Sequence, residues 1–157
     1  MKVAFMGTPD FAVGTLKELI DNQYDVVAVV TQPDKPKGRS KELVFSPVKE
    51  EAVKNNIQVL QPERARDEAF VEELRKYNAD VFVVVAFGQL LPKSIIDMPR
   101  LGCINVHASL LPKYRGASPI QWAVIDGCEY SGVTTMKMDE GLSLIHISEP
   151  TRPEPIS

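Results

Sequence analysis

The chain has 157 residues, of which 44% are hydrophobic and 25% are charged, and its formal net charge at pH 7 is −3. This length suits one globular domain that buries roughly 68–70% of its unfolded surface. The charge excludes a uniformly basic nucleic-acid coat protein, and no apolar run approaches the roughly 20 residues of a membrane-spanning helix.

The amino-terminal stretch reaches Gly7 and Pro9 too early for the apolar core of a signal peptide. We therefore expect a cytoplasmic protein that does not enter a membrane, and we expect a monomer. Cys103 and Cys128 have neither CxxC spacing nor neighbouring metal ligands, so both are predicted to be buried free thiols.

The first sixty residues predict three buried strands separated by helices. The strand segments are short, apolar and rich in β-branched residues, as expected for strands covered on both faces. Asp10 is the expected N-cap of the first helix, and Ser46 before Pro47 is the expected N-cap of the second. In chain order, we predict a strand at 2–6, a helix at 11–20, a strand at 25–31, a helix from 47 and a strand at 57–60.

The remaining sequence continues this alternation, with its strongest strand signal in DVFVVVAF. Strands separated by helices favour an α/β fold with a doubly wound, mainly parallel sheet. The last predicted strand alternates only in part and is expected to be half-exposed. In chain order, we predict a helix at 67–77, strands at 80–87 and 101–106, a helix at 118–126 and a strand at 131–138.

In the stretch GCINVHASLLP, the apolar run of one predicted strand ends with an amide, Asn105, and an imidazole, His107. In doubly wound folds, ligands bind beyond the carboxyl ends of the strands. Asn105 and His107 are two residues apart, so they share a face of an extended strand. An Asn amide can hold a carbonyl oxygen, and a His can donate to the same oxygen or relay a proton. A structural His107, satisfied by backbone groups, is the alternative interpretation.

Two common kinds of site are not predicted. After Gly7 there is neither a dinucleotide-binding glycine motif nor a P-loop, so no dinucleotide site is expected. One His at the predicted rim and scattered acids give no metal-ligand spacing, so we expect no metal.

A short basic segment follows the second predicted strand. Residues 35–41 include four cations and no acid: Lys35, Lys37, Arg39 and Lys41. A solvated loop is one interpretation. The other is a mobile arm that meets phosphates, which attract Lys and Arg whatever the nucleotide sequence.

Several sequence blocks resemble the methionyl-tRNA formyltransferase family. They run from Met1 to about Leu142 as MGTPDFA, TQPDKPKGR, SPVK, VVVAFGQLLP, GCINVHASLLPKYRGASPIQWA and SGVTTMKMDEGL. The resemblance implies a Rossmann-like formyltransferase fold and transfer of a formyl group from 10-formyltetrahydrofolate to the methionine amino group of initiator tRNA.

The same resemblance implies roles for individual residues. Asn105 and His107 match catalytic residues of the family, and Lys35, Lys37, Arg39 and Lys41 match part of its tRNA-binding loop. The implied folate-binding residues are Phe87, Gly88, Gln89, Leu90, Ser109, Leu110, Leu111 and Pro112.

The chain departs from the family after Leu142. Ser143 stands where the family has a catalytic Asp, and a serine gives a charged His107 less electrostatic support. Residues 1–142 are therefore expected to be a partial catalytic domain, incomplete at its carboxyl end. Residues 143–157 look foreign to the family and are expected to be a disordered tail. We expect this chain to be impaired or inactive.

Two other functions stay open on the sequence. One is another folate-dependent formyltransferase or hydrolase, of the glycinamide ribonucleotide type. The other is a folate-binding module without catalytic activity.

Overall fold

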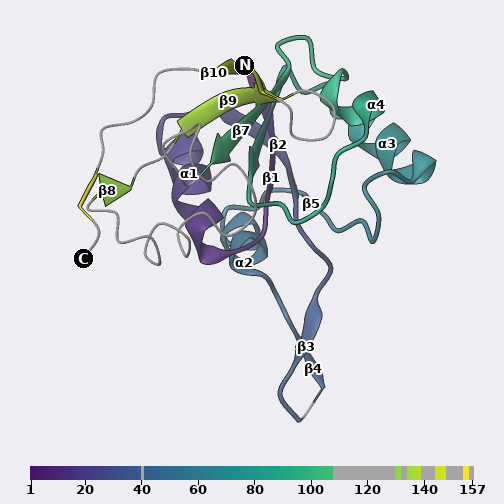
Figure 1. Cartoon of the computed structure of the whole chain (residues 1–157). Helices are drawn as coiled ribbons and strands as arrows, with labels where there is room; N and C mark the ends of the chain where they lie inside the picture. The colour runs from purple at the N-terminus through teal and green to yellow at the C-terminus, as the bar shows by residue number, and fades with distance from the viewer. Residues whose placement is uncertain (40, 108–129, 132–133, 139–143, 148–153, 156–157) are drawn as a thin grey trace.

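The computed structural model describes residues 1–39, 41–107, 130–131, 134–138, 144–147 and 154–155; beyond Val106 it describes only one side chain, that of Met138. The core of the fold is a seven-stranded sheet in the order β10-β9-β7-β6-β1-β2-β5 (Figure 1). Its strands are β1 (Lys2–Gly7), β2 (Asp25–Val30), β5 (Val59–Leu60), β6 (Val81–Val85), β7 (Cys103–His107), β9 (Thr134–Met138) and β10 (Leu144–Ile147).

The part of the sheet from β7 to β5 is parallel throughout, whereas β9 runs antiparallel to β7 and β10 antiparallel to β9. The predicted mainly parallel α/β fold is therefore confirmed. The chain first builds outward from β1 through β2 to β5, and then adds β6 and β7 on the other side of β1. The strand order reverses at the boundary between β1 and β6.

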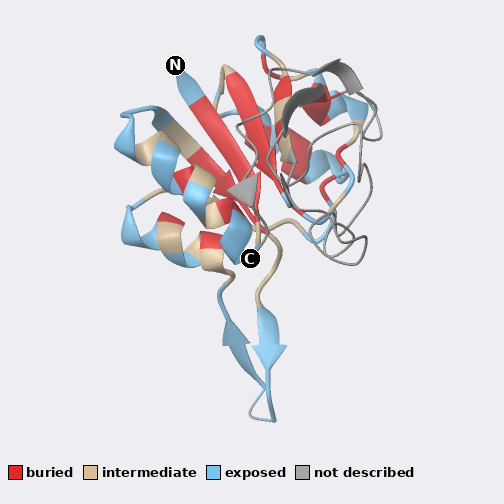
Figure 2. Cartoon of the chain, turned by 60° about the vertical axis from the view of Figure 1, so that its left-hand side comes forward, coloured by how far each residue is buried: buried red, intermediate tan, exposed pale blue. Residues whose placement is uncertain are grey.

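Helices cover both faces of the sheet, as Figure 2 shows. On one face lie α1 (Asp10–Asp21) and α2 (Pro47–Lys54), and on the other lie α3 (Glu68–Arg75) and α4 (Lys93–Ile96). Alternation along β1 serves both layers: Val3 and Phe5 pack with the α1 and α2 cluster, and Ala4 and Met6 pack with the α3 and α4 cluster. The near-continuous apolar strands are thus explained by burial on two faces.

The two predicted helix caps have different outcomes. Ser46 caps α2 as predicted, because its hydroxyl accepts a hydrogen bond of 3.1 Å from the backbone N–H of Lys49. Asp10 was wrong as the N-cap of α1: the cap position is Pro9, and Asp10 is the first helical residue. An acidic residue in the first turn still interacts favourably with the positive end of the helix dipole.

The basic segment, interpreted from the sequence as either a solvated loop or a mobile arm, forms an antiparallel hairpin of β3 (Lys35–Lys37) and β4 (Glu42–Val44). The hairpin projects well away from the sheet (Figure 1). Gly38 follows β3 with φ +70°, a conformation that favours glycine because it has no Cβ. The alternating charged and Pro residues of β3 and the brevity of β4 gave no periodic pattern from which these strands could be predicted.

Other expectations fall partly outside the described residues. The helix predicted at 118–126 lies outside them entirely. The single strand expected at 131–138 is two strands, β8 (Tyr130–Ser131) and β9, and β8 pairs with β11 (Glu154–Pro155). Strands β10 and β11 fall within residues 143–157, and the domain boundary at 142 stays a prediction.

Candidate functional site

The candidate site begins where β1 and β6 end, at the reversal of strand order. The Thr8 hydroxyl lies just after β1 and donates a hydrogen bond of 2.9 Å to the carbonyl oxygen of Phe87, just after β6. The same hydroxyl oxygen accepts a weaker bond of 3.4 Å from the backbone N–H of Gln32, after β2. One side chain therefore joins the carboxyl ends of three neighbouring strands, where doubly wound folds bind their ligands.

The loop after β6 contains four of the predicted folate-binding residues. Its backbone turns sharply, with φ +50° at Ala86 and +92° at Gly88. Phe87 is buried at 2% exposure, whereas Leu90 is 71% exposed. The buried ring of Phe87 thus anchors the loop, and the apolar side chain of Leu90 is exposed to solvent.

Gln89 holds this loop against two other segments. Its Nε2 donates to Gln32 Oε1 at 3.0 Å and to the carbonyl oxygen of Pro62 at 3.1 Å. Its Oε1 accepts from the backbone N–H of Ala65 at 2.7 Å. This carboxamide therefore uses both ends to fix its own loop relative to the segments that follow β2 and β5.

Gln32 also packs closely on Gly88. A Cβ built on Gly88 would lie 2.8 Å from Gln32 Nε2, which is closer than ordinary contacts allow. The absence of a side chain at position 88 therefore lets Gln32 cross the loop. Gln32 was not among the predicted site residues, although it follows the buried strand β2.

Asn105 lies in β7 and is 7% exposed. It is opposite Val84 of β6 on one side and Met136 of β9 on the other. Cys103, two residues earlier, belongs to the α3 and α4 cluster, so strand alternation puts Asn105 on that same face of the sheet. Phe87 also belongs to this cluster. The structure therefore places Asn105 and the loop after β6 on one face.

The structure does not describe the remaining residues predicted for catalysis and folate binding. The backbone of His107 is the last position of β7, paired with Thr134 of β9, and its side chain lies outside the described part. Ser109, Leu110, Leu111, Pro112 and Ser143 lie outside it as well. The roles expected for these six residues stay predictions.

The root of the hairpin is closed by an ion pair. Lys49 Nζ of α2 lies 2.8 Å from Asp34 Oδ2, just before β3, and the two side chains are 13% and 17% exposed. The hydrogen bond from Lys49 lowers the pKa of Asp34, and Gln61, which donates to Asp34 Oδ1 at 2.8 Å, adds to this effect. Asp34 thus holds a negative charge that both neighbours favour.

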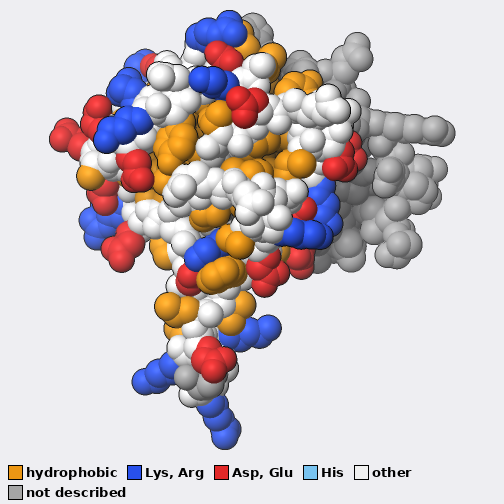
Figure 3. Space-filling model, turned by 180° about the vertical axis from the view of Figure 1, so that it is seen from behind, with side chains coloured by type: hydrophobic (Ala, Val, Ile, Leu, Met, Phe, Trp, Pro, Cys, Tyr) orange, Lys and Arg blue, Asp and Glu red, His pale blue; other side chains and the backbone are white. Residues whose placement is uncertain are grey.

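Beyond its root the hairpin is exposed and basic. All four predicted cations, Lys35, Lys37, Arg39 and Lys41, are exposed. Figure 3 shows the hairpin projecting from the body, with Lys and Arg side chains toward its end and hydrophobic side chains nearer its root. Those apolar residues include Leu43, Val44 and Phe45, which are 65%, 38% and 43% exposed.

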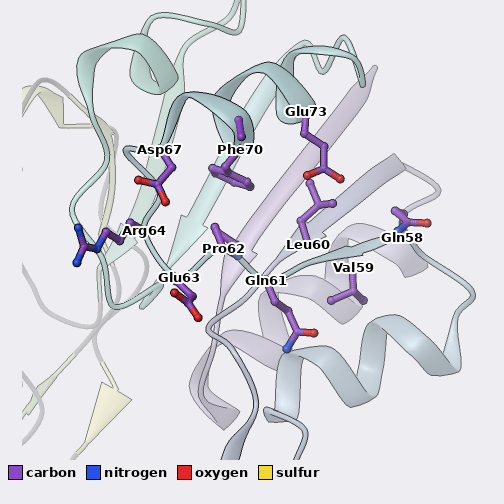
Figure 4. Close-up of a pocket in the computed structure, with 11 residues that line it drawn as sticks. Gln58, Val59, Leu60, Gln61, Pro62, Glu63, Arg64, Asp67, Phe70 and Glu73 are labelled. Atoms are coloured by element: carbon purple, nitrogen blue, oxygen red, sulfur yellow. The ribbon is translucent and has the colours of Figure 1, made fainter.

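A cavity of about 350 Å³ lies elsewhere, between the edge strand β5 and helix α3 (Figure 4). Strands β6, β1 and β2 separate β5 from the strand that holds Asn105. The cavity lining includes Pro62 and Arg64 of the segment that Gln89 contacts, but neither Gly88 nor Asn105. The cavity therefore borders the segment that holds the loop after β6, and it does not contain the predicted catalytic or folate-binding residues.

The described residues add three findings. No group of three His, Cys, Asp or Glu side chains among them could hold a metal ion. No helix within the described ranges is long and apolar enough to cross a membrane. Cys103 is a buried free thiol, as predicted, and burial raises its pKa to about 12; Cys128 lies outside the described part.

Comparison with known proteins agrees with the fold. Residues 1–144 match the family profile described as formyl transferase. Over 142 residues the chain is 85% identical to a methionyl-tRNA formyltransferase of Lachnospira eligens and 66% identical to one of Agathobacter rectalis. These matches cover 90% of the chain but only 45% and 46% of the two relatives. The chain thus spans about half the length of the curated relatives it matches.

A solved structure matches the whole chain at lower identity. The phosphoribosylglycinamide formyltransferase of Bacillus halodurans superposes with a TM-score of 0.77 and 19% identity, covering 100% of this chain and 81% of that one. At this identity the likeness concerns the fold alone.

Proposed function

Because this chain belongs to the formyl transferase family, we propose that it supplies the formyl-transferring portion of a methionyl-tRNA formyltransferase. The reaction moves a formyl group from 10-formyltetrahydrofolate to the methionine amino group of initiator tRNA. The observation that carries the proposal is the 85% identity to the Lachnospira eligens enzyme over 142 residues. The glycinamide ribonucleotide alternative has only distant fold neighbours in its favour.

The chemistry rests on Asn105 and His107. The neutral amine attacks the formyl carbon, and negative charge develops on the formyl oxygen. The bond from the formyl carbon to the folate nitrogen then breaks; the amine loses a proton and the folate nitrogen gains one, a transfer that His107 or a bound water could relay. The Asn105 amide and a protonated His107 would stabilise that oxygen, and removing one such donor typically slows turnover about 10²–10³-fold. The burial of Asn105 supports this role, because a hydrogen bond to a developing anion is stronger away from water.

The formyl donor would bind on the same face of the sheet. Phe87, Gly88, Gln89 and Leu90 would line its pocket together with Ser109, Leu110, Leu111 and Pro112. The fixed loop supports this assignment, since Gln89 and Thr8 hold its backbone before any ligand arrives. A pre-ordered pocket loses less conformational entropy on binding.

The hairpin would bind the tRNA. Lys35, Lys37, Arg39 and Lys41 would approach phosphates, and Phe45, Leu43 and Val44 would add apolar contact near its root. Translation initiation places such an enzyme in the cytoplasm, and a monomer is sufficient for this arrangement.

The activity is tested in a chimera whose residues after Leu142 come from the Lachnospira eligens relative. Formyl transfer to initiator methionyl-tRNA is expected, and Asn105→Ala should lower turnover by about 10²–10³-fold. A chimera that binds 5-formyltetrahydrofolate but transfers nothing would identify a silent folate-binding module. Transfer to glycinamide ribonucleotide instead of tRNA would overturn the assigned acceptor.

The tRNA assignment has its own test. The double variant Lys37→Glu, Arg39→Glu should weaken tRNA binding and flatten its salt dependence, because each lost phosphate contact lowers the slope by about 0.9 or less. The matched control reverses two exposed cations on α1 and after α3, in Lys17→Glu, Lys76→Glu. Equal losses in both double variants would show a general charge effect and remove the hairpin from the tRNA site.

A further inference from the structure

We infer that Gln32 is a positioning residue that couples the root of the basic hairpin to the loop formed by residues 86–91. The inference rests on the proposed function, since it assigns the hairpin to the acceptor tRNA and the loop to the formyl donor. It adds a physical connection between the two substrate sites.

Gln32 makes the connection on the loop side. Its Oε1 accepts the 3.0 Å hydrogen bond from Gln89 Nε2, and its side chain crosses Gly88 at a distance that excludes a Cβ there. Its backbone N–H reaches the Thr8 hydroxyl that also holds Phe87. A movement of residue 32 would therefore act on the loop through two independent contacts.

The hairpin side starts two residues later. Gln61 Nε2 donates both to the Gln32 carbonyl oxygen at 3.3 Å and to Asp34 Oδ1 at 2.8 Å. Asp34 then pairs with Lys49 at 2.8 Å, so the strand that enters the hairpin is joined to the helix that follows it. Only Pro33 separates Gln32 from Asp34.

The opposite leg of the hairpin is held at the same place. Thr31 Oγ1 and Ser46 Oγ lie 2.7 Å apart, and Lys49 Nζ sits 3.8 Å from the centre of the Phe45 ring. Both legs of the hairpin thus end on a polar framework that is continuous with Gln89. Among the described residues, no fully buried side-chain nitrogen or oxygen lacks a hydrogen-bond partner.

Such a framework has a consequence for two large substrates. A tRNA that engages the hairpin tip would restrain the root and, through Gln32, the loop beside Asn105. The amine and the formyl carbon must be held in register for attack, and small misplacements cost large factors in rate. Gln32 contacts neither reacting group in this scheme, and it acts through Gln89 and Gly88.

Amide hydrogen exchange of residues 86–91 tests the connection. Adding initiator tRNA to the chain should slow this exchange about three- to ten-fold, the effect of strengthening one hydrogen bond. Gln32→Ala should retain protection of the hairpin but lose the slowing at 86–91. Gln32→Glu keeps the oxygen that Gln89 needs and should restore it. Gln58→Ala, which removes an exposed Gln outside the framework, should behave as the unaltered chain.

A second arm needs no RNA. Lys49→Met breaks the ion pair at the root and should speed exchange at 86–91 about three- to ten-fold, but not when combined with Gln32→Ala. The same increment with and without Gln32, or no increment at all, would overturn the inference. Failure of tRNA to protect the hairpin would instead count against the proposed function, and the Lys49→Met arm would still decide the coupling.

Discussion

Asp34 Oδ2 accepts a 2.8 Å hydrogen bond from Lys49 Nζ at the point where the basic hairpin leaves the body of the protein. The pair joins the residue before β3 to the first turn of α2. Charged pairs that are largely shielded from water have stronger mutual attraction than exposed ones. This contact fixes the segment that enters the hairpin to the helix that follows the hairpin.

The first prediction concerns the pH dependence of this pair. The pKa of Asp34 is lowered in the folded state, so the stability it contributes is present above the unfolded pKa and is lost as pH falls through the folded pKa. Asp34→Asn should therefore reduce the free energy of unfolding at about pH 6 and have a smaller effect at about pH 3. Urea unfolding at both pH values measures the difference. Glu63→Gln, an exposed carboxyl change, is the control.

The cap of α2 gives a second prediction. Ser46→Ala removes the acceptor for the Lys49 backbone N–H and the partner of the Thr31 hydroxyl. The free energy of unfolding should fall by about 1–2 kcal/mol. Ser94→Ala, at an exposed position of α4, should change it by less than about 0.5 kcal/mol. Equal values for the two variants would mean that the hydroxyl of Ser46 contributes nothing specific.

The third prediction compares substitutions of two glycines, Gly88 and Gly14. Gly88→Ala should destabilise the fold by about 1–2 kcal/mol, because its φ is +92° and the new methyl group would meet Gln32. Gly14→Ala lies inside α1 with no atom within 4 Å of the new carbon, so it should stabilise the helix by about 0.5–1 kcal/mol. Thermal unfolding of both variants checks the opposite signs. A neutral Gly88→Ala would refute the close crossing of Gln32.

The fourth prediction concerns the reactivity of Cys103. Burial raises its pKa to about 12, and its Sγ lies 3.7 Å from Met138 Sδ inside the core. At about pH 8 only about one thiol in 10⁴ would be ionised, and access is closed as well. Iodoacetamide should leave Cys103 unmodified in the native chain and modify it in urea, as read by peptide mass spectrometry. Rapid native labelling of Cys103 would contradict its burial.

The local part of the fold was predictable because its signals are local. The apolar runs of β1 and β6 require burial on both faces, and Ser46 before Pro47 marks a helix start whatever surrounds it. The same kind of signal failed at Asp10, because a neighbouring Pro9 already had the extended conformation that a cap requires. Helix α4, with only four residues, was too short to show a period.

The candidate site was predictable only in part. Asn105 was identified because it stands with His107 on one face at the end of a predicted strand and matches a catalytic residue of the family; the structure shows in addition that it is buried. Gln32, Gln61 and Lys49 were not identified, since each is an ordinary polar residue in its own segment. Nothing in the spacing of Gln32 and Gln89, which are 57 positions apart, predicts that their carboxamides meet.

The sequence by itself determined the alternation of strands and helices, the two-sided burial of β1 and β6, and the presence of a basic segment, because period and composition act within a few residues. Only the tertiary structure decided that this segment is a hairpin and that its root reaches the loop after β6. Those contacts depend on the reversal of strand order beside β1, which brings the ends of β2, β5 and β6 within hydrogen-bond distance of one another.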